Sequence, residues 1–321
     1  MVTYVIRRIL YMIPVLFATS LIIFTFVTVS GDPLGQVRQI PRVSQQTIDN
    51  IIEQNHLDRS LPVQYGFWLK EAVTNKFGNT LLSDEPIWPD LKRVMGNTLQ
   101  FIILAEILAV SIAIGVGVLS AVKQYSIFDY GATTLSFVGF STPVFWFALI
   151  LQVLFTNIYL NYGVRIFYTA QLSSPNPDNF LIDRLQHLAL PVITLTVLGV
   201  AQFTRYMRAS MLEVINSDYV RTARAKGLNE RKVIMKHAFR NALIPLVTVV
   251  ALDFGGLFAS AFATETVFAL DGMGLYFLRA LSARDVYPLM AWLMVTSLIV
   301  VVFNLIADLI YGWLDPRIRY E

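Results

Sequence analysis

The sequence contains no cysteine and only three histidines in 321 residues. Without cysteine the chain has no disulfides, no thiolate nucleophile and no cysteine-ligated metal. The histidines, His56, His187 and His237, are scattered without the spacing of a metal site. We therefore expect this chain to bind no metal and no cofactor of its own.

Charge is also scarce, because only 15% of the residues are charged whereas 55% are apolar. Soluble domains carry about a quarter charged residues. The formal net charge of +3 is too small to indicate a nucleic-acid partner. Such a composition fits either a large enzyme with a buried core or a membrane protein, and continuous apolar runs separate the two.

Six stretches are long and apolar enough to cross a bilayer, which takes about 20 residues as a helix. They cover approximately residues 9–29, 99–122, 131–157, 188–204, 243–264 and 288–311. The sequence therefore predicts an all-α polytopic membrane protein with six transmembrane helices. The first stretch follows Arg7 and Arg8 and could be a cleaved signal peptide, but its length and the lack of a cleavage site favour an uncleaved anchor.

Lysine and arginine in short loops indicate orientation, since they concentrate on the cytoplasmic side. One side holds Arg7, Arg8, Lys123, Arg205, Arg208, Arg221, Arg224, Lys226, Arg231, Lys232, Lys236, Arg240, Arg317 and Arg319. The short loops of the other side hold Arg165, Arg184, Arg279 and Arg284. We therefore place both termini in the cytoplasm.

This topology divides the chain into an N-terminal helix (1–30), an extracytoplasmic segment (31–97), a core of five helices (98–312) and a cytoplasmic tail (313–321). The core contains a cytoplasmic loop at 205–241. In the extracytoplasmic segment, Ser44 followed by Ile48, Ile51 and Ile52 predicts a short capped amphipathic helix.

The cytoplasmic loop has the pattern of two short helices. Ser217 or Asp218 can cap the first helix, and Gly227 can end it because glycine adopts positive φ freely. Asn229 can cap a second helix that runs to about Arg240.

One face of the first helix carries Val220, Ala223 and Gly227, which are small enough for a partner to approach closely. A basic loop that only sets topology or meets anionic lipid is the alternative. The ordered cap, small face and glycine favour a protein-docking element.

Three carboxylates fall within or near the apolar stretches: Glu106, Asp253 and Asp308. Charged groups inside a membrane are costly and usually functional. Glu106 and Asp253 are candidates for lining a pathway, or else pins between helices. Asp308, near the end of its stretch, is a candidate structural residue that pairs with Arg317 or Arg205.

The loop resembles the signature of ABC importer permeases, in which Glu-Ala-Ala, three residues and Gly precede nine residues and Ile-x-Leu-Pro. Arg221-Thr222-Ala223 and Gly227 hold the corresponding positions, whereas His237 to Arg240 departs from the final part. That departure is itself similar to the oligopeptide and dipeptide branch. The branch shows the strings found here at Tyr219 to Gly227 and at Arg240 to Pro245.

Shorter motifs resemble the B-type subunits of that branch in the right order. They are Arg7 to Leu10 with Ile13-Pro14, Gly31 to Pro33, Asn97 to Leu99, Glu265 to Phe268 with Gly272 to Gly274, and Asp315 to Arg319. Asp271 departs from the pattern, since proline is common there.

The resemblance implies a type I ABC importer permease in a bacterial plasma membrane. A second permease, two ATPases that hold ATP and Mg, an extracytoplasmic substrate-binding protein and membrane lipid would be its partners. The ATPase-coupling helix would comprise Asp218, Tyr219, Val220, Arg221, Thr222, Ala223, Arg224, Ala225, Lys226 and Gly227. The chain lacks a Gly-x-x-x-x-Gly-Lys-Ser/Thr loop, so it is expected to be no enzyme itself.

Peptides are the substrates that the resemblance implies, while nickel complexes, glutathione-like compounds and sugars remain alternatives. A proton-coupled secondary carrier would also use buried carboxylates, although such carriers often show inverted repeats, which we do not find. A scaffold or sensor that docks a partner through the basic loop is a further alternative.

Overall fold

The computed structural model describes residues 2–30, 34–35, 37–39, 43–81 and 83–314. Within these residues the regular structure is helical, and the only strand-like feature is an isolated bridge between Asn79 and Pro86. The chain forms two compact units. The core unit comprises the described residues of Thr98–Leu270 and Phe303–Glu321, and the cap unit comprises those of Val2–Asn97 and Asp271–Val302.

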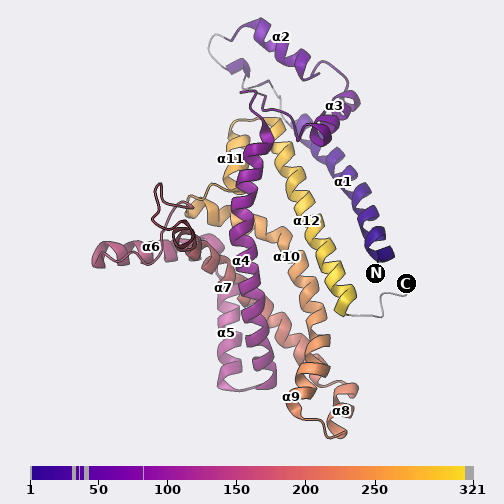
Figure 1. Ribbon diagram of the computed structural model, residues 1–321, viewed down its shortest axis with the longest axis vertical. Helices are drawn as coiled ribbons and strands as arrows, with labels where there is room; N and C mark the ends of the chain where they lie inside the picture. The colour runs from indigo at the N-terminus through magenta and orange to yellow at the C-terminus, as the bar shows by residue number, and fades with distance from the viewer. Residues whose placement is uncertain (1, 31–33, 36, 40–42, 82, 315–321) are drawn as a thin grey trace. The chain divides into compact units, whose positions relative to one another are not determined.

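Figure 1 shows the helices and their labels. In chain order they are α1 (Val2–Ser30), η1 (Val37–Gln39), α2 (Gln45–Gln54), α3 (Leu61–Thr74), α4 (Ile87–Val122), α5 (Ile127–Ser141), α6 (Val144–Tyr162), α7 (Phe180–Ile215), α8 (Asp218–Ala225), α9 (Glu230–Lys232), η2 (Val233–Ala238), α10 (Phe239–Val267), α11 (Met273–Ser282) and α12 (Val286–Leu314).

Six helical segments among the described residues are long and apolar enough to cross a membrane. They are Ile6–Val29, Ile87–Val122, Val144–Tyr162, Phe180–Ile215, Glu230–Phe254 and Val286–Ile310. The length and composition of these helices confirm the prediction of an all-α chain with six membrane-spanning helices.

The third predicted span, 131–157, is wrong as a single helix. The structure has α5 and α6 in its place, and Thr142 between them is extended with ψ of 123°. Pro143 explains the break, because proline lacks an N–H and disfavours helical geometry in the residue before it. Of the two helices, only α6 is long enough to cross the bilayer.

Two other helices extend well beyond their apolar runs. The run at 188–204 is the middle of α7, which starts at Phe180 behind an Asn179 cap and keeps Pro191 inside. The run at 99–122 is the second part of α4, which starts at Ile87. Hydropathy identifies the lipid-compatible portion of a helix, whereas caps and packing determine where the helix begins and ends.

Helix α7 packs closely against its neighbours in the core unit because three glycines leave room for them. A Cβ added at Gly117 would lie 2.7 Å from the Cβ of Met207. A Cβ at Gly199 would lie 2.7 Å from that of Ala109. Gly139 similarly faces Ala201, at 2.8 Å. Such small-residue crossings bring helix backbones together in membranes, where packing drives helix association.

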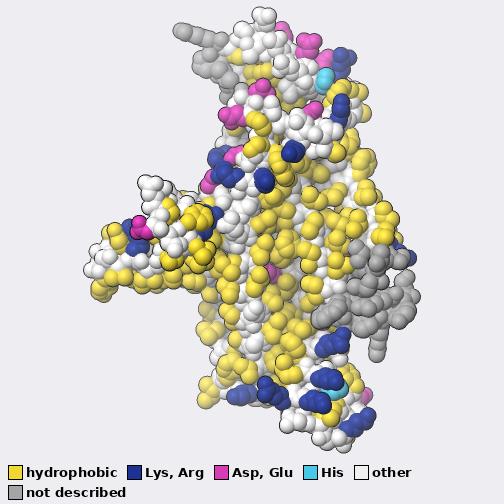
Figure 2. All heavy atoms as spheres, viewed as in Figure 1, with side chains coloured by type: hydrophobic (Ala, Val, Ile, Leu, Met, Phe, Trp, Pro, Cys, Tyr) yellow, Lys and Arg dark blue, Asp and Glu magenta, His cyan; other side chains and the backbone are white. Residues whose placement is uncertain are grey.

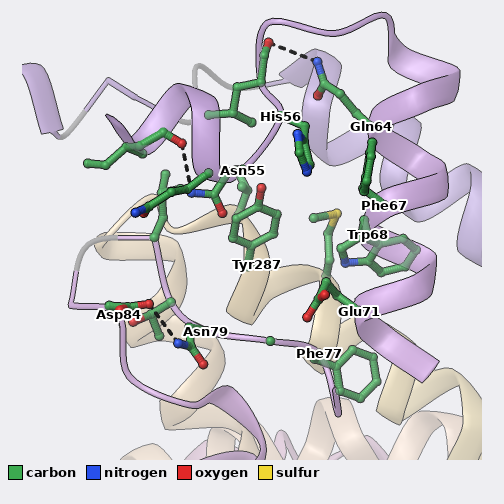
Figure 3. A pocket seen from close by; sticks show the side chains of 18 of the residues that line it. Asn55, His56, Gln64, Phe67, Trp68, Glu71, Phe77, Asn79, Asp84 and Tyr287 are labelled. Atoms are coloured by element: carbon green, nitrogen blue, oxygen red, sulfur yellow. Dashed lines mark hydrogen bonds between the residues drawn. The ribbon is translucent and has the colours of Figure 1, made fainter. Parts of the chain in front are cut away.

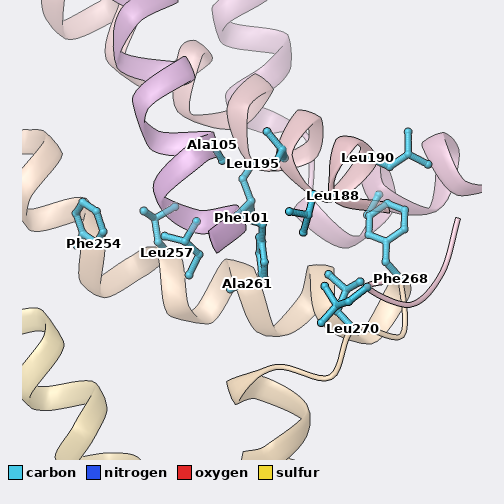
Figure 4. Close-up of a cluster of buried hydrophobic side chains, with 14 residues drawn as sticks. Phe101, Ala105, Leu188, Leu190, Leu195, Phe254, Leu257, Ala261, Phe268 and Leu270 are labelled. Atoms are coloured by element: carbon cyan, nitrogen blue, oxygen red, sulfur yellow. The ribbon is translucent and has the colours of Figure 1, made fainter. Parts of the chain in front are cut away.

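One apolar cluster of the core unit joins α4, α7 and α10, as Figure 4 shows. Phe101 of α4 and Phe268 after α10 are each at most 1% exposed. Two family-like motifs also meet in this unit, because the Thr98 hydroxyl donates a 2.5 Å hydrogen bond to the buried Glu265 carboxylate.

In the cap unit, Ser44 caps α2 by accepting the Thr47 N–H at 3.1 Å, and Ile48 is buried. The predicted capped amphipathic helix is thus confirmed. Asp271, which departs from the motif resemblance described above, forms ion pairs with Arg93 and Arg279.

Candidate functional site

Helix α8 occupies the predicted docking element and runs from Asp218 to Ala225. Ser217 has the extended backbone of an N-cap, but its hydroxyl donates to the Val214 carbonyl at 2.6 Å instead of capping. Asp218 lies in the first turn and pairs with Arg221 at 2.7 Å. A negative charge is favourable there, because the N-terminus of a helix carries partial positive charge.

Gly227 ends this element with a φ of +75°. Its N–H donates to the Arg224 carbonyl at 2.9 Å. A Cβ built at Gly227 would have no heavy atom within 4 Å, so the requirement for glycine comes from the backbone angle and not from crowding. The predicted glycine cap is confirmed.

The prediction that Val220 and Ala223 face a partner is wrong. Val220 is 0% exposed and Ala223 is 6% exposed, and both pack into the chain's own core. Their cluster includes Phe203, Val233 and Ala238. A two-turn helix must bury its apolar face to be stable, and α7 and η2 of the same chain already cover it.

The outward face of α8 is polar and accessible. It presents Tyr219, Arg221, Thr222, Ala225 and Lys226, all of which are exposed. The Arg221 side chain is 69% exposed. This face, hereafter the outward face, is the part of the element that remains free for contact with another protein.

Arg224 leaves the outward face and ties α8 to the residues after Gly227. Its guanidinium donates to both carboxylate oxygens of Glu230, at 2.7 Å and 3.1 Å. The pair bridges the glycine turn and fixes α8 relative to α9.

The second predicted helix, from Asn229 to about Arg240, is wrong as a continuous α-helix. The Asn229 side chain caps α9 by accepting the Arg231 N–H at 2.9 Å, as predicted, but α9 has only three residues. The π-helical segment η2 follows before α10 begins at Phe239. Such segments occur frequently at functional sites, and no sequence pattern identifies this one.

Figure 2 shows Lys and Arg side chains gathered around α8 and α9 at one end of the core unit. Arg231, Lys232 and Arg240 line an open depression that also includes Asn229 and His237. Part of the positive charge that the sequence places in the 205–241 loop therefore lies around α8 and α9.

A buried ion pair that sequence analysis missed links α5 to α7 at Arg208, almost three helical turns before the start of α8. Arg208 donates to both oxygens of Asp129, at 2.6 Å and 2.8 Å. The Ser120 hydroxyl and the Tyr125 N–H donate to the same carboxylate. Asp129 is 2% exposed, so it is fully enclosed by its donors. The pattern Ser126-x-x-Asp129 was the available signal, because it marks a helix start.

Comparison with known proteins identifies the family of this chain. Residues 113–320 match the family described as "Binding-protein-dependent transport system inner membrane component". The chain belongs to this family. It is 37% identical to the oligopeptide transport system permease protein AppB of Bacillus subtilis, with all of both chains covered. It is also 36% identical to the dipeptide permease DppB of Alkalihalophilus pseudofirmus and 33% identical to DppB of Escherichia coli, again over the full length of both chains.

The two pathway candidates of this permease have different surroundings. Glu106 is 5% exposed, and one of its carboxylate oxygens has no hydrogen-bond partner among the described residues. It lines an apolar groove of about 400 Å³ with Leu246 and Phe303. Asp253 accepts a 3.0 Å hydrogen bond from Gln202, which is the contact expected of a pin between helices.

Arg317, one predicted partner of Asp308, lies outside the described residues. The other, Arg205, lies over the ring of Phe140 at 4.0 Å. The pairing of Asp308 with either arginine stays a prediction.

Proposed function

We propose that this chain is one of two permeases of an ATP-binding-cassette importer that takes up peptides across a bacterial plasma membrane. One observation supports peptides as the substrate class. The relatives reported above align over their whole length, and each is named as a permease for oligopeptides or dipeptides. Nickel complexes, glutathione-like compounds and sugars are the competing substrates that an uptake assay would reveal.

In this proposal the energy comes from two ATPase subunits, which bind ATP and Mg, and an extracytoplasmic binding protein delivers the substrate. The coupling helix Asp218 to Gly227 meets one ATPase through the outward face. Both termini lie in the cytoplasm together with α8. The divisions 1–30, 31–97, 98–312 and 313–321 retain their proposed roles as anchor, extracytoplasmic segment, transport core and tail.

The contacts of α8 support this role. A docking helix transmits force only if it moves together with the membrane-spanning helices. Val220 and Ala223 anchor α8 in the chain's core, and Arg224 ties it to Glu230. An ATPase that prefers one position of α8 would therefore bias the arrangement of α7 and α10, which is the physical requirement for coupling.

Co-purification in mild detergent tests the docking face. Ala225→Glu adds a bulky charge at an exposed position of the outward face without disturbing the buried side of α8. We expect wild type to retain the ATPases and the second permease, and Ala225→Glu to lose the ATPases alone. Ala170→Glu is the matched control, because Ala170 is also exposed but lies in a different loop.

Retention of the ATPases by Ala225→Glu would contradict the docking assignment. A wild-type chain that purifies without any ATPase would favour a proton-coupled carrier, which stops transporting when a protonophore is added. Glu106 and Asp253 are proposed to line the pathway, and Glu106→Gln should then change the uptake of peptides with charged termini.

A further inference from the structure

The cap unit contains a cavity of about 470 Å³ that the coupling mechanism leaves without a role. This volume lies within the range of small-molecule sites, roughly 300–1,000 Å³. α1, α2, α3, α12 and the segment after α3 all contribute residues to it. Figure 3 shows the cavity and the side chains that point into it.

The floor of the cavity is apolar. Phe24, Trp68, Val286 and Met290 line it, and each of these residues is at most 8% exposed. Higher up, the ring of Phe67 stacks on His56 with a centroid separation of 3.8 Å. The cavity therefore offers an apolar slot with aromatic walls, suited to an uncharged side chain.

Trp68 supplies a hydrogen-bond donor that none of the described residues accepts from. Trp68 is 5% exposed, and its indole Nε1 has no hydrogen-bond partner among the described residues. Figure 3 shows the ring nitrogen of Trp68 on the side of the ring nearer Tyr287. Buried donors are normally satisfied, and an indole N–H can only donate. The Trp68 indole N–H thus lacks an acceptor, which the carbonyl oxygen of a ligand would supply.

Glu71 supplies the complementary charge. It lies three residues after Trp68, so both side chains project from the same face of α3. One of its oxygens accepts a 2.9 Å hydrogen bond from Asn75. The lining also includes Asp84, and no lysine or arginine occurs among its described residues. This balance favours a positively charged group close to Glu71.

We propose that the cavity binds the amino-terminal residue of a peptide or of an amino-acid amide. The α-ammonium group would meet Glu71, the adjacent carbonyl oxygen would accept from Trp68 Nε1, and the apolar side chain would enter the slot above Phe24 and Met290. The site chemistry follows from the cap unit alone. Imported peptide as the natural source of the ligand rests on the proposed function.

Calorimetric titration of the purified importer complex with L-phenylalaninamide tests the proposal, because this probe carries all three groups and no carboxylate. We expect saturable binding that weakens about tenfold or more in Glu71→Gln, as for a hydrogen bond to a charged group. 3-Phenylpropanamide lacks the ammonium group. We expect its affinity for wild type to lie about tenfold or more below that of L-phenylalaninamide. 2-Phenylethylamine, which lacks the carbonyl, should bind about fivefold more weakly.

Glu53→Gln is the matched control, since Glu53 is exposed on α2 and does not line the cavity. Trp68→Phe removes the indole donor and should weaken the binding of phenylalaninamide more than that of 2-phenylethylamine, which has no carbonyl oxygen to accept from it. Should that variant fail to fold, the pair of probes tests the donor in wild type. Absent saturation, equal binding to Glu71→Gln, or equal affinity for 3-phenylpropanamide would overturn the proposal.

Phenylalanyl-alanine distinguishes the source. Binding of both the dipeptide and the amide, each dependent on Glu71, indicates a peptide end, whereas binding of the amide alone restricts the site to amino-acid amides without a chain beyond the carbonyl. A parallel uptake assay separates this inference from the proposed function. Intact peptide uptake without amide binding refutes the cavity site only, and Glu71-dependent binding without peptide uptake refutes the importer's substrate class only.

Discussion

The buried pair between Asp129 and Arg208 allows a quantitative prediction about the helices that carry α8. Removing one partner of a buried ion pair leaves an uncompensated charge and costs about 3–5 kcal/mol. Asp129 is 2% exposed, whereas Arg208 is 25% exposed. The two single substitutions should therefore differ in cost, because only the arginine can turn towards solvent.

Arg208→Met leaves the carboxylate with the Ser120 hydroxyl and the Tyr125 N–H as its main donors. We expect a loss of about 3 kcal/mol in unfolding free energy, at the lower end of the range because these donors remain. Asp129→Asn keeps the shape and loses one charge, so we expect about 1.5–2 kcal/mol. The double variant should lose less than the sum of both.

Unfolding of the purified chain by sodium dodecyl sulfate, followed by far-UV circular dichroism, measures these differences in the four variants. Arg208 holds the pKa of Asp129 well below its usual range. A depressed folded-state pKa contributes stability above the unfolded value of ~3.9, and that stability is lost only as the pH falls through the folded value. The difference between wild type and Asp129→Asn should therefore stay constant from pH 8 to pH 5.

A larger loss in Asp129→Asn than in Arg208→Met would refute the argument from burial. Additive costs in the double variant would show that the two side chains do not interact energetically. A difference that changes between pH 8 and pH 5 would mean that the pKa of Asp129 in the folded protein lies above its ordinary value and that Arg208 is not its close partner.

Three further predictions concern packing, backbone and topology. Gly117→Ala should lower the unfolding free energy by about 1–3 kcal/mol through overpacking. Gly115→Ala is the control and should be neutral or slightly stabilising, because no heavy atom lies within 4 Å of its added Cβ. The midpoint temperatures of thermal unfolding of the two variants test this difference. Gly227→Ala should cost about 1–2 kcal/mol because of its positive φ, and Gly227→Asn clearly less, by the same detergent titration; equal costs would contradict this. Cysteines placed at Ser44 and Ala225 of this cysteine-free chain should react from opposite sides of the membrane, and reaction from one side would overturn the proposed orientation.

The long apolar runs were the most predictable part of the fold. Bilayer thickness sets their length, and each run has to satisfy its backbone hydrogen bonds internally. Residues outside the bilayer obey no such constraint. The first turns of α4 and the π-helical segment η2 could not be predicted, because local packing decides their geometry. The break at Pro143 could have been predicted, because proline restricts its neighbours regardless of context.

Side-chain partners across long sequence distances were the least predictable part of the site. Asp129 and Arg208 are 79 residues apart, and their pairing follows only once α5 and α7 are in contact. The unused indole donor of Trp68 also depends on elements from both ends of the sequence, since α1 and α12 close the cavity beside it. A single sequence shows the chemical groups but not which of them meet.

The misassigned face of α8 leads to a more general point about coupling. The spacing of Val220 and Ala223 correctly indicated an apolar face, but amphipathicity does not say which protein covers that face. Had a partner covered it, α8 would depend on that partner for its stability, because an isolated two-turn helix is marginal in water. Burial within the chain instead keeps α8 formed and attached to η2 and α10 whether or not an ATPase is bound. In the proposed coupling, the outward face would then bind and release a partner without α8 unfolding, and every displacement of α8 would act directly on η2, which holds Val233 and Ala238.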